Sequence, residues 1–64
     1  MTDAAFLTAA ARMAPVDLPG SPKGVYALGD GKGDYIIYVA SGAEEPKLEG
    51  KVHRIDARVL WIEK

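Results

Sequence analysis

Two features of the sequence hold residue types that could carry out chemistry: a glycine-rich segment and a single histidine. The segment reads Gly29-Asp30-Gly31-Lys32-Gly33 and is followed by Asp34. Backbone amides in such segments can cradle a phosphate, and acidic side chains can bind calcium. However, the spacing matches neither a nucleotide-binding glycine motif nor an EF-hand, and Asp30 and Asp34 would repel a phosphate. The pattern therefore predicts a plain hairpin loop, with no metal and no cofactor.

His53 is the chain's only histidine, and the chain contains no cysteine. A zinc site would have to combine His53 with carboxylates alone, and no second histidine supplies a metal-ligand spacing. As a general base, His53 would need a nucleophile and an orienting acid, but no hydroxyl-bearing residue lies in a recognised nucleophile motif. The sequence therefore predicts a surface histidine on a strand and no catalytic residues.

Length and charge limit the remaining function classes. The chain has 64 residues and a formal net charge of −1, so we expect one small domain spanning residues 1–64 and no polybasic nucleic-acid arm. A chain this short has little spare stability, and oligomerisation is a usual remedy. Asp3 and Arg12 make the start unlike a secretory signal, and the longest apolar run is far too short to cross a bilayer. We expect a cytoplasmic protein with no membrane segment.

The start of the chain has the pattern of a helix over residues 2–14. Thr2 is a suitable N-cap, and Pro15 disfavours helical geometry at the residue before it. Three larger apolar side chains are expected to anchor the helix on a sheet: Phe6, Leu7 and Met13. Residues 15–23 are predicted to be a connector, in which Pro19-Gly20 suits the middle of a type II turn.

After residue 23 the pattern becomes that of β-strands joined in hairpins. The predicted strands cover residues 24–28, 34–40, 49–55 and 58–63. We therefore predict an α+β fold, in which the N-terminal helix packs on a four-stranded antiparallel β-meander. A small SH3-like or OB-like barrel is the alternative architecture.

Apolar side chains occupy both faces of the predicted sheet. In the second strand Tyr35, Ile37 and Val39 alternate with Ile36 and Tyr38, and all five are apolar or aromatic. One helix can cover only one face, and contiguous apolar patches usually mark an interaction site. Three explanations remain: a partner covers the second face, the sheet closes into a barrel, or some tyrosines are simply exposed.

These observations predict a small non-catalytic protein-binding or accessory module. It would dock its two-sided apolar sheet onto a protein partner or form a homo-oligomer, for example by pairing the strand 58–63 with its symmetry mate. Because Tyr, Trp and Arg dominate interface energetics, the predicted partner-binding residues are Tyr35, Tyr38, Arg58 and Trp61. Tyr35 and Tyr38 point in opposite directions, so both cannot serve one flat interface.

The alternative function is a module that binds single-stranded nucleic acid. Four basic residues of the C-terminal hairpin would contact phosphates, with aromatic rings as stacking platforms: Lys51, Arg54, Arg58 and Lys64. The slightly negative net charge argues against this alternative, because affinity for nucleic acid depends on the number of neutralised phosphates.

Overall fold

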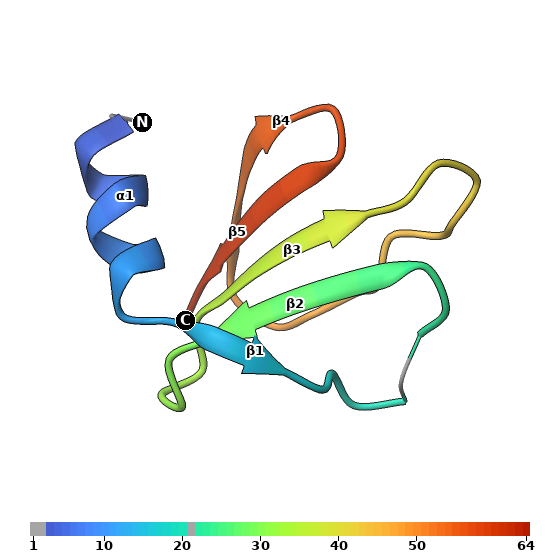
Figure 1. The fold of residues 1–64 in the computed structure, drawn as a ribbon, viewed down its shortest axis with the longest axis horizontal. Helices are drawn as coiled ribbons and strands as arrows, with labels where there is room; N and C mark the ends of the chain where they lie inside the picture. The colour runs from blue at the N-terminus through green and yellow to red at the C-terminus, as the bar shows by residue number, and fades with distance from the viewer. Residues whose placement is uncertain (1–2, 21) are drawn as a thin grey trace.

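The computed structural model describes residues 3–20 and 22–64 and confirms the α+β class. The described residues form one helix and five strands: α1 (Asp3–Ala11), β1 (Ala14–Val16), β2 (Val25–Gly29), β3 (Tyr35–Val39), β4 (Lys51–Asp56) and β5 (Val59–Glu63). Figure 1 shows α1 beside an open sheet, at the end where the chain also terminates. Within the described ranges, no helix has the length and apolarity needed to span a membrane.

The sheet is antiparallel throughout, with the strand order β1-β2-β3-β5-β4. This order departs from the expected meander, because β3 pairs with β5 and β4 lies at an edge. The apolar strand β5 occupies the interior position, whereas the charged strand β4 faces solvent at the edge, where charged side chains protect against further strand pairing. The proposed pairing of the strand 58–63 with a symmetry mate is therefore wrong, since β5 already has a neighbour on each side.

The predicted connector 15–23 is wrong at its start, because residues Ala14–Val16 form the edge strand β1. Pro15 lies opposite Leu28 of β2. An edge strand tolerates a proline, because the missing N–H can face away from the sheet. The helix is correspondingly shorter than predicted and ends at Ala11. The predicted N-cap, Thr2, lies outside the described residues.

Helix α1 is attached to the sheet only loosely. From Ala4 to Ala11 every side chain is exposed or half-buried. Leu7 is 63% exposed, so the prediction that it anchors the helix is wrong; Phe6 and Met13 are half-buried. The helix instead turns small alanine side chains toward Trp61 of β5.

The two faces of the sheet are covered differently. We call one the loop face; its strand residues are Val25, Ala27, Tyr35, Ile37, Val39, Leu60 and Ile62. We call the other the helix face; its residues are Tyr26, Leu28, Ile36, Tyr38, Val59 and Trp61. The main core lies on the loop face, where Ile37 and Ile62 are almost completely buried.

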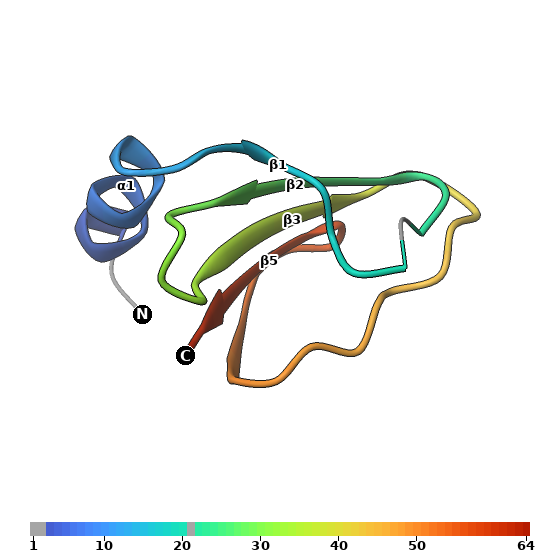
Figure 2. The ribbon, with the colours of Figure 1, turned by 90° about the horizontal axis from the view of Figure 1, so that it is seen from below.

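Two connecting segments cover the loop face. Leu18 is buried there, and Ala43 and Leu48 of the segment 40–50 pack against the same core. Figure 2 shows both connections running beneath the sheet. Gly24, at φ +75°, permits this packing because a Cβ there would lie 2.7 Å from the Cβ of Ala43. The chain's own loops therefore shield one of the two apolar faces that the sequence predicted.

Candidate functional site

The helix face carries the largest exposed aromatic side chains of the sheet. Tyr26 of β2 lies directly opposite Tyr38 of β3 and is 56% exposed, while Tyr38 is 46% exposed. At Tyr38 the strand β3 is paired with both β2 and β5, and Tyr26 is paired with β3 one residue beyond the end of the β1–β2 pairing. The backbone beneath the two tyrosines is therefore held firmly. We call this feature the tyrosine pair.

Sequence reasoning predicted Tyr38 as a contact residue but missed Tyr26. The glycine-rich loop contained the necessary signal. In a hairpin whose loop is centred on Lys32, residues equally far from Lys32 along the chain lie opposite one another. Tyr26 precedes Lys32 by the same distance by which Tyr38 follows it, and the two are paired in the sheet. Tyr35 points to the other side, as predicted, and is half-buried against the loop-face core. Only one of the two predicted tyrosines therefore belongs to an exposed surface.

Trp61 lies on the helix face but is only 7% exposed. Its indole ring packs against the ring of His53 from β4, with centroids 4.8 Å apart and planes tilted by 32°. His53 Nε2 is in turn 3.1 Å from Glu63 Oε1. The predicted surface histidine is therefore half-buried and covers part of the indole, and Trp61 is placed as a core residue beneath α1.

Arg58 lies in the turn between β4 and β5 and is exposed. Its carbonyl oxygen accepts a hydrogen bond from the backbone N–H of Val39, at 2.8 Å. Arg58 thus borders the same strand end as Tyr38, while Trp61 lies further along β5 beneath the helix. The four predicted contact residues are not brought together into one surface.

The four basic residues of the nucleic-acid alternative are also spread out. Arg54 is on the loop face opposite Leu60, and its Nη2 lies 3.0 Å from each carboxylate oxygen of Glu45. Lys51 lies on the other face, opposite Glu63. Arg58 and Lys64 flank the two ends of strand β5, about 20 Å apart at the usual rise per residue. No continuous basic surface results from this arrangement.

The glycine-rich segment forms a hairpin loop, in which the amides of Lys32 and Asp34 are used internally. Asp30 Oδ1 accepts hydrogen bonds from the backbone N–H of Lys32, at 2.7 Å, and of Asp34, at 3.3 Å. The Lys32 hydrogen bond is the main reason that the pKa of Asp30 lies below its ordinary value. Asp34 Oδ1 accepts the N–H of Lys64 at 2.8 Å, which ties the end of β5 to the loop. These amides are therefore not available to cradle a phosphate.

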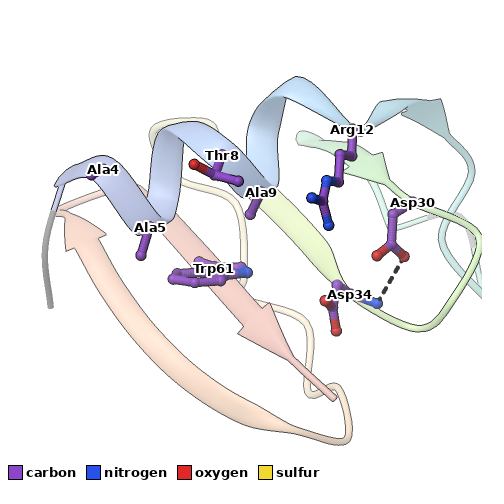
Figure 3. A pocket seen from close by; sticks show the side chains of 8 residues that line it. All are labelled: Ala4, Ala5, Thr8, Ala9, Arg12, Asp30, Asp34 and Trp61. Atoms are coloured by element: carbon purple, nitrogen blue, oxygen red, sulfur yellow. Dashed lines mark hydrogen bonds between the residues drawn. The ribbon is translucent and has the colours of Figure 1, made fainter.

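A cleft of about 440 Å³ lies between α1 and this loop. Trp61 lines it from below, alanines of α1 line it from above, and Arg12, Asp30 and Asp34 line one end (Figure 3). Of the residues that the structure describes, no group of three histidine, cysteine or acidic side chains could hold a metal ion. The cleft and the tyrosine pair are thus two separate features of the helix face.

Comparisons of this chain with protein-family models, with curated proteins and with solved structures found no match.

Proposed function

We propose that this protein is a small non-catalytic binding module that docks the tyrosine pair onto another protein surface, and that this surface is a second copy of the chain. The observation that carries the proposal is the direct opposition of Tyr26 and Tyr38 at 56% and 46% exposure. Tyrosine supplies a large contact area with few rotatable bonds, and the position of both tyrosines in paired strands lowers the entropy lost on binding.

The sequence left open which face of the sheet would dock, and in the structure the loop face is already covered by Leu18, Ala43 and Leu48. Docking is therefore assigned to the helix face alone. The molecule measures 29 × 24 × 18 Å along its principal axes, so its broad face approaches the roughly 800 Å² that each partner contributes to a stable interface. A two-fold axis near the tyrosine pair would place the same two tyrosines of each copy against each other.

Two further observations favour a second copy as the partner. The net charge of −1 creates little long-range repulsion between copies. A chain of 64 residues also gains more from burying an additional apolar surface than a larger domain does, because less of its surface is buried on folding.

Sedimentation velocity from micromolar to millimolar concentration tests this proposal. We expect a reversible monomer–dimer equilibrium that Tyr38→Ser weakens by about tenfold or more and that Tyr26→Ser/Tyr38→Ser abolishes. Val52→Ser is the matched control, because Val52 is a similarly exposed apolar side chain (53%) on the loop face of β4. It should leave the dimer intact.

Thermal unfolding of each variant separates loss of association from loss of fold, since both tyrosines are about half exposed and their replacement should leave the monomer folded. A wild-type protein that remains monomeric at millimolar concentration would refute the dimer. Equal dimerisation of wild type and the double variant would place the interface elsewhere.

A further inference from the structure

The cleft beneath α1 contains a buried hydrogen-bond donor that has no acceptor. Trp61 is only 7% exposed, and its Nε1 makes no hydrogen bond. A buried polar group without a partner is unfavourable by about 1–3 kcal/mol relative to the solvated group, and such groups are rare in native proteins. Figure 3 shows the nitrogen-bearing edge of the indole directed toward the side of the cleft that holds Arg12 and Asp34.

Arg12 supplies a second set of donors to the same space. It follows the C-terminus of α1, and its guanidinium projects from the helix toward the cleft (Figure 3). Among residues 3–20 and 22–64, the structure shows no hydrogen bond or ion pair for this guanidinium. Guanidinium and indole N–H donors converging on one space suit a carboxylate, which can accept from both at once.

Asp30 and Asp34 line the end of the cleft that also holds Arg12. The hydrogen bonds that each carboxylate accepts from the loop and from Lys64 involve Oδ1, which leaves Oδ2 as an acceptor for a ligand. Two carboxylates would repel a simple anion, so a carboxylate ligand needs a cationic group on its other side. The charge arrangement therefore matches a small zwitterion.

We propose that this cleft binds a free α-amino acid, with its carboxylate held by Arg12 and Trp61 Nε1 and its ammonium group facing Asp30 and Asp34. The alanines of α1 and the indole ring form the apolar part of the cleft, which accommodates an apolar amino-acid side chain. The volume of about 440 Å³ lies within the range of small-molecule sites.

Nε1 itself is buried, so contact with a ligand requires a small movement of the groups around it; we assign this movement to α1, whose alanines lie over the indole. No side chain from Ala4 to Ala11 is buried, so the movement mainly loses the contacts between these alanines and Trp61. Binding would in return give the indole N–H its missing acceptor and fix the position of the helix. This inference does not depend on the dimer proposed above, since the tyrosine pair and the cleft share no residue.

The chain has one tryptophan, so the ¹⁵N-labelled protein has one indole N–H signal that reports on the site directly. We would titrate glycine, L-leucine and L-phenylalanine, and compare L-leucine with two matched probes. 4-Methylpentanoate lacks the ammonium group, and 3-methylbutylamine lacks the carboxylate. The expected result is a saturable downfield shift of the indole proton with L-leucine or L-phenylalanine, and about tenfold weaker binding of both matched probes.

Three variants complete the test. Arg12→Gln should weaken L-leucine binding by about tenfold or more, because it removes a charge-assisted hydrogen bond. Arg58→Gln, a change of the same type at the distant β4–β5 turn, should have no effect. Asp34→Asn retains an acceptor for the Lys64 N–H but removes the negative charge. It should therefore weaken the binding of L-leucine and strengthen the binding of 4-methylpentanoate.

Opposite effects of Asp34→Asn on the affinities for L-leucine and 4-methylpentanoate would support the zwitterion site. A merely structural role of Asp34 would change both affinities in the same direction. The proposal is overturned if none of the three amino acids produces a saturable shift. It is also overturned if Arg12→Gln binds L-leucine as tightly as the wild type does.

Discussion

The imidazole of His53 covers the indole of Trp61, with ring centroids 4.8 Å apart. The two residues are directly opposite in the β4–β5 pair, so the contact joins the edge strand to the interior of the sheet. Glu63 Oε1, 3.1 Å from His53 Nε2, holds the imidazole in this orientation. On this face of the edge strand, His53 is the residue that shields the buried aromatic side chain from solvent.

We predict that His53→Ala destabilises the protein by about 1 kcal/mol, because it removes a ring contact and exposes one side of the indole. Trp61 fluorescence should shift to longer wavelength in the folded state, and urea unfolding should show the lower stability. Lys51→Ala on the same strand is the control, since Lys51 is exposed. A variant with unchanged emission and stability would show that the imidazole does not shield the indole.

We predict that Trp61→Ala lowers the free energy of unfolding by about 3–5 kcal/mol, the usual loss for a large aromatic side chain in a core. Trp61→Phe should remain within about 1–2 kcal/mol of the wild type, because losing the unpaired Nε1–H offsets part of the lost packing. Chemical unfolding followed by circular dichroism measures both variants. Equal destabilisation by the two substitutions would argue against an unsatisfied indole N–H.

We predict that Gly24→Ala is clearly more destabilising than Gly31→Ala. Both glycines have left-handed backbone angles, φ +75° and φ +78°, so both variants carry a similar conformational penalty of about 1 kcal/mol. Only at Gly24 does a new Cβ meet a neighbour, at 2.7 Å from the Cβ of Ala43, whereas nothing lies within 4 Å at Gly31. The difference between their thermal midpoints therefore measures how tightly the segment 40–50 packs on the sheet. Equal midpoints would contradict this packing.

We predict that Asp30 contributes to stability above acidic pH. The hydrogen bond from the Lys32 amide lowers the pKa of Asp30 below its ordinary value of 3.8. Folding therefore favours the ionised carboxylate, and its contribution is fully present above the unfolded-state pKa. This contribution is lost as the pH falls through the lowered folded-state pKa.

Asp30→Asn should accordingly reduce the slope of unfolding free energy against pH between about pH 5 and pH 2. Urea unfolding across this range provides the measurement, and Ser41→Ala is a surface control that changes no titratable group. A wild-type slope in Asp30→Asn would show that Asp30 has the same pKa in both states.

Local sequence patterns correctly predicted the α+β class, the four longer strands to within about two residues at each end, and both hairpins. These features depend on alternation of side chains, on glycines and on prolines, which act over a few residues. The same alternation correctly placed Tyr35 and Tyr38 on opposite faces of the sheet, but it did not decide which face is covered.

The strand order, the strand β1, the poorly buried helix and the partners of Trp61 were decided by tertiary structure. Each depends on competition between segments that are distant in the sequence. Leu18 and Leu48 cover the loop face, while α1 lies on the side of Trp61. Local residue patterns were enough to predict which segments are strands and that both sheet faces are apolar. Only the folded chain decided what covers each face, because burial free energy depends on total apolar area, to which distant loops contribute as effectively as a helix.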